Sequence, residues 1–292
     1  DTRLNRKVAI KRMLGDAAKS QTAVRRFLTE AQSIAAINHL NVVQIYDYGR
    51  AEDGPFLIME YVDGGSLLDK CREGALPLEE AVELTCQLCD GLSKAHEANI
   101  IHRDIKPANL LVSTDAQTGQ PVVKILDFGL ARFVSETKID GGITRTGEIM
   151  GSPDYIAPEQ ALNAKDADIR ADIFGLGCTF FEMLTGTLPY GGKSITEKIY
   201  SRLDRQAAKL SSRRPDIPPT LERIVSKMLE CDPSRRYQTP GDLATALQSF
   251  RNDIAVESDS IIILITQKYK VGSTMICGYA LNCSNVSSST SE

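Results

Sequence analysis

Hydrophobic positions in the first part of the chain follow two different periods. Short apolar runs at 8–11, 42–48 and 55–61 are rich in β-branched and aromatic residues, which predicts strands. Between the first two runs, apolar residues recur every three to four positions, which predicts one helix with a single buried face: Val24, Phe27, Leu28, Ala31, Ile34 and Ala35. Ser20 precedes this stripe and is a suitable N-cap.

After the pair Gly64 and Gly65 the pattern changes to long helices. Residues 81–95 place their apolar side chains on one face, and residues 173–184 are apolar on nearly all sides, which predicts a buried helix that ends at Gly186. Shorter helical patterns follow near 194–202, 219–230 and 240–251. A β-rich part followed by a larger helical part predicts a two-lobed α+β fold, with a hinge near 61–65 and a ligand in the cleft between the lobes.

The expected divisions are a small lobe at 1–62, a large lobe at 63–253 and a tail at 254–292. Within the tail, Ile261 to Ile265 form an unbroken apolar run, which is compatible with a docked strand, an interaction segment or the product of a faulty gene model. Residues 282–292 are rich in serine and are predicted to bury too little apolar surface to stay ordered.

Composition excludes several classes of protein. The chain has 292 residues, of which 42% are hydrophobic and 25% charged, and its net charge of -4 provides no basic footprint for nucleic acid. Of the seven cysteines only Cys86 and Cys89 form a C-x-x-C pair, and no second pair stands at zinc spacing, so reduced thiols are expected. No apolar run approaches the ~20 residues that a membrane-spanning helix needs, and we expect a cytoplasmic location.

The strongest chemical pattern is the run HRDIKPAN at 102–109, followed eighteen positions after Asn109 by the motif DFG at 127–129. An apolar strand predicted at 122–126 leads into that second motif. Mg²⁺ prefers carboxylate and amide oxygens, which Asp127 and Asn109 would supply. Asp104 would position an acceptor hydroxyl and take its proton, and Lys106 would place positive charge where a transferred phosphoryl group gathers negative charge.

Together with the motif APE at 157–159, these runs resemble the protein-kinase family, and in particular the bacterial form of its eukaryotic-like Ser/Thr kinases. The resemblance covers roughly residues 1–253. It implies that the γ-phosphoryl group of ATP passes to a protein hydroxyl, and that Mg²⁺, or Mn²⁺ in its place, is held by Asn109 and Asp127. A lysine at position 106 and the absence of tryptophan are typical of the Ser/Thr class rather than the tyrosine class.

The resemblance also assigns roles in nucleotide binding. Lys11, in the run VAIK, would contact the α- and β-phosphates and pair with Glu30 on the following helix. Met59 takes the gatekeeper place, and the backbone groups of Glu60 and Val62 would meet the adenine base.

Regulatory and structural roles follow in the same way. Thr144 and Thr146 stand at the phosphorylated positions of an activation loop, and Arg103 would receive the phosphate after autophosphorylation in a transient dimer. Ser152 lies in the substrate-docking segment, where it would bond the catalytic aspartate and lysine. Two further matches are structural: Asp172 with Gly177 in the helix beneath the catalytic loop, and Arg236 paired with Glu159.

One departure from the family pattern leaves alternatives open. No G-x-G-x-x-G precedes Lys11, so we expect an N-terminally truncated domain that binds ATP weakly. A catalytically weak, pseudokinase-like binding module is therefore the first alternative. Measuring turnover and nucleotide binding side by side would distinguish it from an active kinase. A small-molecule phosphotransferase is the second, and the APE motif argues against it.

Overall fold

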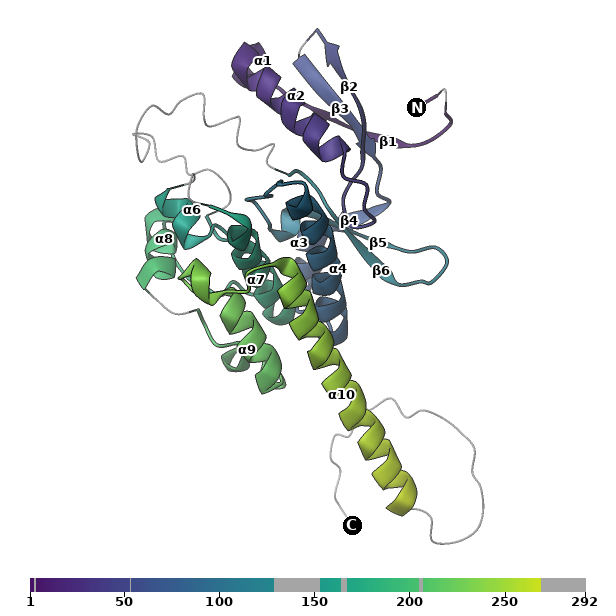
Figure 1. The fold of residues 1–292 in the computed structure, drawn as a ribbon, viewed down its shortest axis with the longest axis vertical. Helices are drawn as coiled ribbons and strands as arrows, with labels where there is room; N and C mark the ends of the chain where they lie inside the picture. Colours follow the sequence, from purple (N-terminus) through teal and green to yellow (C-terminus); the bar gives the residue numbers. More distant parts are fainter. Residues whose placement is uncertain (3, 53, 129–152, 164–166, 205–206, 269–292) are drawn as a thin grey trace, which may run out of the picture. The chain divides into compact units, whose positions relative to one another are not determined.

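The computed structural model describes residues 1–2, 4–52, 54–128, 153–163, 167–204 and 207–268 (Figure 1). Of residues 255–268 it describes the backbone alone, and the side chain of Glu30 is likewise not described. Thr144, Thr146 and Ser152 lie outside the described residues. The chain divides into two units, Asp1–Phe250 and Arg251–Glu292.

The first sheet contains the three strands predicted near the start of the chain. They are β1 (Val8–Arg12), β2 (Ile45–Ala51) and β3 (Gly54–Glu60), all antiparallel with β3 in the middle. β2 begins three residues later than predicted, because Val42 instead forms a parallel bridge with Ile125 of a second sheet. The segment before β2 therefore links the two sheets.

Helices α1 (Asp16–Lys19) and α2 (Gln21–Ala35) connect β1 to β2, and α2 contacts β2. Three members of the predicted apolar stripe, Phe27, Ala31 and Ile34, are buried, together with Ala23, while Val24, Leu28 and Ala35 are half-buried. The Ser20 hydroxyl accepts the N–H of Ala23 at 3.3 Å, so the predicted N-cap is confirmed.

A second antiparallel sheet has the order β4 (Gly64–Ser66), β5 (Leu110–Thr114), β6 (Pro121–Ile125). Its first strand requires a glycine, since a Cβ on Gly64 would stand 2.1 Å from the carbonyl oxygen of Val112. Helix α3 (Leu67–Glu73) follows β4, and β6 leads directly to Asp127.

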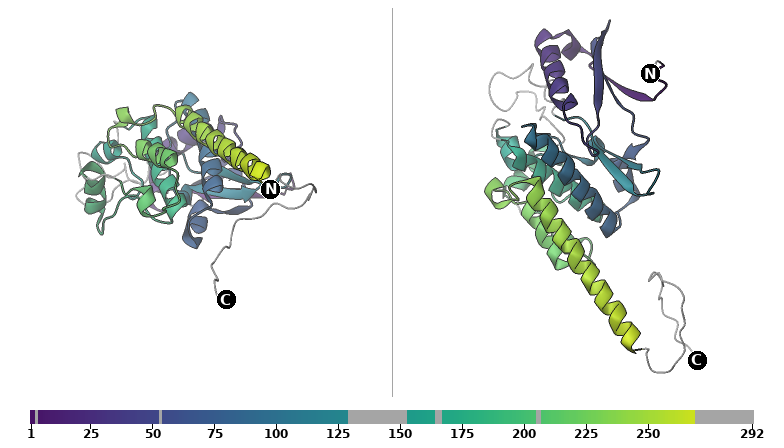
Figure 2. Two further views of the ribbon diagram at one scale, coloured as in Figure 1. Left: turned by 90° about the horizontal axis from the view of Figure 1, so that it is seen from below. Right: turned by 45° about the vertical axis from the view of Figure 1, so that its right-hand side comes forward.

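The other secondary structure described in the first unit is helical (Figure 2). The buried helix α7 (Ile169–Thr185) contacts both α4 (Leu78–Glu97) and α9 (Pro219–Met228), while α6 (Pro158–Leu162) contacts α8 (Ile195–Asp204). Gly186 ends α7 as predicted, with a φ of +67° and its N–H bonded to the carbonyl of Glu182 at 2.7 Å. Single 3₁₀ turns occur at η1 (Pro107–Asn109), η3 (Leu210–Ser212) and η4 (Pro233–Arg235).

Helix α10 (Pro240–Lys268) begins in the first unit and continues into the second. The apolar run from Ile261 to Ile265 belongs to this helix, so it does not form a strand. Among the described residues, no helix combines the length and the apolar character that crossing a membrane requires.

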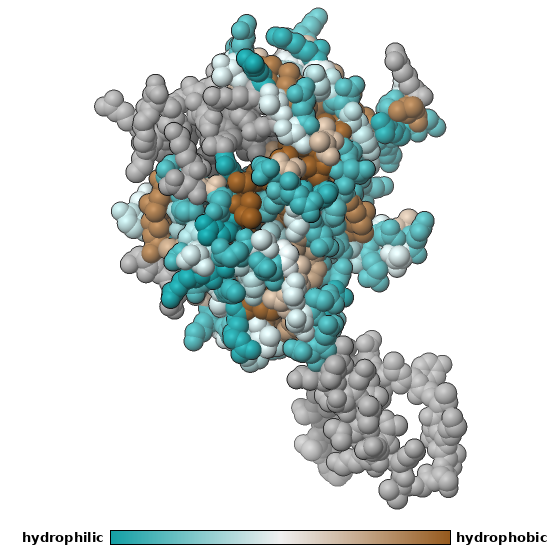
Figure 3. All heavy atoms as spheres, viewed as in Figure 1, coloured by the Kyte–Doolittle hydropathy of each residue, from teal (hydrophilic) through white to brown (hydrophobic). Residues whose placement is uncertain are grey.

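Hydrophobic side chains occupy only small, separate areas on the described face shown in Figure 3. The large apolar residues exposed on the molecule include Ile10 on β1, Leu162 at the end of α6 and Tyr200 on α8. Scattered apolar side chains of this kind are normal on protein surfaces.

Candidate active site

The loop at 102–106 is held in a strained backbone conformation by a buried carboxylate. Arg103 has a φ of +65°, which is unfavourable for a residue with a Cβ. Asp172, near the start of α7, accepts the N–H of Arg103 at 2.6 Å and the N–H of His102 at 2.9 Å. Oδ2 of Asp172, which accepts the His102 N–H, also lies 2.9 Å from His96 Nε2. The expected place of Asp172 beneath the catalytic loop is confirmed.

His102 joins this loop to the segment around Asp127. Its ring is fully buried, with Nε2 2.8 Å from the carbonyl of Leu126 and Nδ1 accepting the N–H of Asp104 at 3.2 Å. These two bonds place the ring proton on Nε2, because the carbonyl can only accept. The ring also packs on Phe128, with centroids 4.8 Å apart. Sequence reasoning assigned His102 no role of its own, although its place in the motif was a signal.

Asp104, Lys106 and Asn109 meet at the end of the loop. Lys106 Nζ lies 2.6 Å from Asp104 Oδ2, and Asn109 Nδ2 donates to the same oxygen at 2.9 Å and to the Asp104 carbonyl at 2.8 Å. One oxygen of Asp104 is thus bonded to two donors, whereas none of these bonds uses Oδ1. Oδ1 is therefore the atom that an acceptor hydroxyl would approach.

Asp127 follows β6 with a φ of +66°, and its Oδ1 lies 2.5 Å from Nζ of Lys11 on β1. The structure thus brings the predicted phosphate-binding lysine against the predicted metal-binding carboxylate. Glu30 is in α2, but because its side chain is not described, its pairing with Lys11 stays a prediction.

The residues present suit a Mg²⁺ ion that arrives together with phosphate. The N–H of Leu126 donates to the carbonyl of Asn109 at 2.9 Å, which couples the backbones that carry Asn109 and Asp127. The amide oxygen of Asn109 is not used in its bonds to Asp104, so it remains able to act as a ligand. Within the described part of the chain no three His, Cys, Asp or Glu side chains cluster as a metal site. A site with one carboxylate and one amide matches Mg²⁺, which usually takes its other ligands from substrate phosphates and water.

The predicted adenine-binding residues lie at the end of β3. Met59 is buried between Ala9 of β1 and Ile45 of β2, as a gatekeeper position requires. The Glu60 carboxylate is turned towards β6, where Lys124 Nζ lies 3.0 Å from its Oε1. Val62, which is half-buried, follows in the connection to β4. Contact of these residues with a base stays a prediction.

The segment that precedes α6 is anchored by two pairs that the sequence did not reveal. The Tyr155 hydroxyl donates to Glu182 Oε2 of α7 at 2.6 Å, and Lys198 of α8 lies 2.7 Å from Asp154. Burial raises the pKa of the Tyr155 hydroxyl and also that of the Glu182 carboxyl. Both pairs fix the backbone on which a substrate-docking segment would rest.

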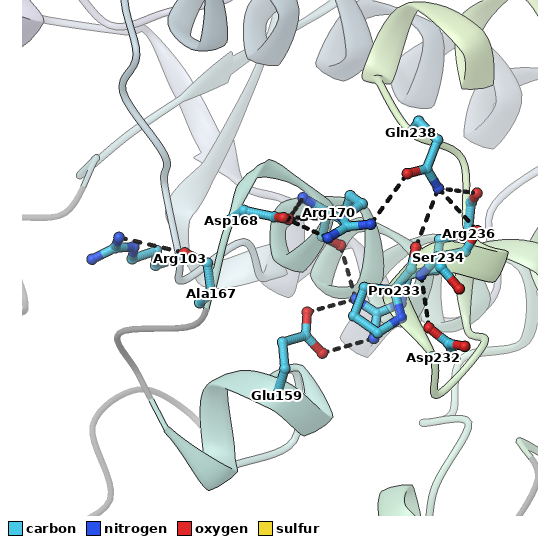
Figure 4. A network of polar contacts seen from close by, with 10 residues as sticks. All are labelled: Arg103, Glu159, Ala167, Asp168, Arg170, Asp232, Pro233, Ser234, Arg236 and Gln238. Carbon is cyan, nitrogen blue, oxygen red and sulfur yellow. Dashed lines mark hydrogen bonds and ion pairs between the residues drawn. The ribbon is translucent and has the colours of Figure 1, made fainter.

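Glu159 and Arg236 form the predicted ion pair, shown in Figure 4. Both guanidinium NH₂ groups contact the carboxylate, at 2.7 Å and 2.8 Å. The buried guanidinium also donates to three backbone carbonyls from two parts of the chain: Arg170 in α7, and the neighbours Glu230 and Cys231. This arrangement ties α6 to α7 and to the segment before α10.

Arg103 has spare donor capacity. Its guanidinium makes one long bond, 3.5 Å to the carbonyl of Ala167, and its buried Nε has no partner among the described residues (Figure 4). Such a half-buried cation beside the catalytic loop is suited to an anionic partner.

Comparison with known proteins matches the model of the protein kinase domain to residues 1–248. Curated relatives include the serine/threonine-protein kinase PknB of Mycobacterium leprae, 37% identical over 253 residues that cover 85% of this chain and 39% of the relative. PknB of Mycobacterium tuberculosis is 35% identical over 268 residues, covering 90% of this chain and 41% of the relative. The chain thus spans about two fifths of the length of these relatives.

Solved structures show the same fold. The kinase domain of PknI from Mycobacterium tuberculosis matches with a TM-score of 0.63 and 26% identity, covering 83% of this chain and 85% of that one. A structure of Rad53 residues 1–466 in complex with AMP-PNP matches with a TM-score of 0.64 and 23% identity, covering 81% and 56%, and shows the fold alone.

Proposed function

The chain belongs to the protein kinase domain family, and from that membership we propose that it transfers the γ-phosphoryl group of ATP to serine and threonine hydroxyls of proteins. The convergence of Asp104, Lys106 and Asn109 on one face of a loop that is bonded to the Asp127 segment carries this proposal. Serine/threonine-protein kinases among the curated relatives support the choice of acceptor.

In the proposed reaction the acceptor hydroxyl binds at Asp104. As its oxygen bonds to the γ-phosphorus, the bond to the bridging oxygen of ADP breaks, and the hydroxyl proton passes to the Asp104 carboxylate and then to solvent. Lys106, which already contacts Asp104, offsets the negative charge on the transferred group.

Lys11 and Asp127 would receive the phosphates of the nucleotide. Lys11 would contact the α- and β-phosphates, while Asp127 and Asn109 would hold Mg²⁺, or Mn²⁺ in its place. When bound, the ion neutralises charge on the phosphates. Glu30 would orient Lys11, and the end of β3, with Met59 and Glu60, would line the adenine site together with Val62.

Regulation by phosphorylation is part of the proposal. Thr144 and Thr146 would be phosphorylated in a transient dimer, and Arg103, whose guanidinium has spare donors, would bind the added phosphate. Ser152 would help dock the substrate.

The pseudokinase-like alternative gains no support, since the comparisons match protein kinases and none favours a non-catalytic module. A cytoplasmic location stays a prediction.

Transfer of labelled phosphate from [γ-³²P]ATP to a serine/threonine substrate tests the proposal. The full chain should label serine and threonine but not tyrosine, and Asp127→Asn should abolish the labelling because the metal-binding carboxylate is lost. Asp90→Asn, at an exposed position on α4, is the matched control and should keep the activity of the parent. A fully active Asp127→Asn variant would contradict the assigned role.

A further inference from the structure

β6 is an edge strand of its sheet, and it is the strand that carries Asp127. Its partner β5 lies on one side only, with Val112 opposite Val123 and Leu110 opposite Ile125. Since backbone groups of alternate residues point to opposite sides of a strand, the groups of Pro121, Val123 and Ile125 are directed away from β5. Such edge groups need other partners when they are buried.

The side chain of Gln87, on α4, supplies two of these partners. Its Oε1 accepts the N–H of Val123 at 3.0 Å, and its Nε2 donates to the carbonyl of Pro121 at 3.0 Å. Nε2 also lies 3.1 Å from Glu83 Oε1 one turn earlier on the same helix. One amide thus bonds to alternate residues along the edge of β6, as a neighbouring strand would.

The segment before β2 supplies the remaining partners. Asn41 Nδ2 donates to the Val123 carbonyl at 2.8 Å and to Gln87 Oε1 at 3.1 Å. Ile125 bonds through its N–H to the Asn41 carbonyl at 2.8 Å and through its carbonyl to the N–H of Val43 at 3.0 Å.

Helix α4 approaches this segment closely. A Cβ on Gly91, one turn beyond Gln87, would stand 3.1 Å from the Asn41 carbonyl oxygen and 3.0 Å from Ile125 Cδ1. This close packing leaves the Gln87 amide facing the edge of β6, where it joins α4 to the strand.

We propose that Gln87 is a positioning residue for Asp127, in that it fixes the free edge of β6 and thereby the place of the carboxylate two residues beyond Ile125. In this role Gln87 would act through the backbone of Val123, whose N–H its Oε1 accepts, rather than by touching the metal itself. The inference rests on the proposed role of Asp127 in holding Mg²⁺.

Two variants of the full chain test the inference. Gln87→Met removes both polar atoms at similar length, whereas Gln87→Glu keeps the acceptor for Val123 and Asn41. Hydrogen exchange of the Val123 amide and the ratio of ADP dissociation constants without and with Mg²⁺ are measured for each. Tyr190→Phe, which loses a buried bond to the Leu229 carbonyl at 3.1 Å, is the control for destabilisation alone.

In Gln87→Met the Val123 amide should exchange about fivefold to tenfold faster, as expected for one lost hydrogen bond. The Mg²⁺-dependent gain in ADP affinity should fall about tenfold. This is the lower end of the loss in metal affinity that follows when a residue orienting a metal ligand is removed. Gln87→Glu should keep the protection of Val123 and most of that gain. Tyr190→Phe should lower the melting temperature and leave the gain unchanged.

The outcomes separate two kinds of failure. If Mg²⁺ does not change the ADP affinity of the parent chain, the proposed metal role of Asp127 is wrong, and this inference is wrong with it. If Mg²⁺ raises the ADP affinity of the parent and of a folded Gln87→Met variant by the same factor, only the inference about Gln87 is wrong. If Gln87→Met does not fold, Gln87→Glu tests the inference. A large loss of its Mg²⁺ response while the Val123 amide stays protected from exchange would show that the bond to Val123 does not position Asp127.

Discussion

At the scale of single residues, the site depends on short polar contacts, some of them between neighbours in sequence. Asp104 is bonded to Lys106 and Asn109, and the loop that carries them owes its shape to the buried carboxylate of Asp172. Lys106 and Asn109 contact only Oδ2 of Asp104, which thus holds the loop together. We propose that Oδ1 meets the substrate hydroxyl.

The first prediction concerns this oxygen. Asp104→Asn should lower turnover by at least ~10²-fold, because a general base contributes 10²- to 10⁴-fold, while ATP affinity stays near that of the parent. Initial rates of phosphate transfer and titration with an ATP analogue measure the two effects. Asp253→Asn, at an exposed position of α10, serves as the control. Parental turnover in Asp104→Asn would show that this carboxylate is not the base.

At the scale of helices and strands, three contacts between distant elements support the residues of the site. α7 supports the catalytic loop through Asp172, and the pair of Glu159 and Arg236 ties α6 to the segment before α10. In the same way, α4 completes the edge of β6 through Gln87. Each contact joins elements that are distant in sequence, so its loss should affect the stability of the domain as well as its activity.

The ion pair of Arg236 provides the second prediction. Arg236→Met leaves the Glu159 carboxylate without its charge partner and three backbone carbonyls without donors, so it should lower the free energy of unfolding by ~3 to 5 kcal/mol. Urea denaturation measures the change. Arg235→Met is a matched control, since the neighbouring guanidinium is largely exposed and lies 4.0 Å from Glu230, and exposed pairs contribute about 0–1 kcal/mol. Equal losses in the two variants would contradict the buried role.

At the scale of the whole molecule, the fold brings together residues from different sheets and lobes. Lys11 of the first sheet reaches Asp127 at the end of the second, and the bridge between Val42 and Ile125 joins the same two sheets. Residues of both sheets would therefore contact the nucleotide. For autophosphorylation we propose that a second copy of the chain is the acceptor.

The third prediction follows from this arrangement. Phosphate should appear on Thr144 or Thr146, and the initial rate of its incorporation should rise with the square of the protein concentration, because two molecules must meet. The double change to alanine should lower activity towards a peptide, since Arg103 would lack its phosphate partner. Mass spectrometry and initial rates at several concentrations test this. Full activity with both threonines unmodified would contradict the switch.

The sequence alone was sufficient to predict the family and much of the local structure. The spacing of Asp104, Lys106 and Asn109 is local, the N-cap at Ser20 depends on its immediate neighbours, and Gly186 ends α7 through its own backbone freedom. Such features depend on residues a few positions apart, so periodicity and motif spacing are enough to predict them. The ion pair of Glu159 and Arg236 was predicted only because it accompanies the family resemblance.

Tertiary structure decided the contacts between distant segments. No periodicity relates Gln87 to Val123, Tyr155 to Glu182 or Lys11 to Asp127, because packing alone brings each of these pairs together. The run at Ile261–Ile265 shows the same limit, since intrinsic preference is a weak guide and these residues instead continue the helix that begins at Pro240. The sequence therefore determined the family and the groups to which we assign the chemistry, whereas the packing of helices and sheets decided what holds each group in place.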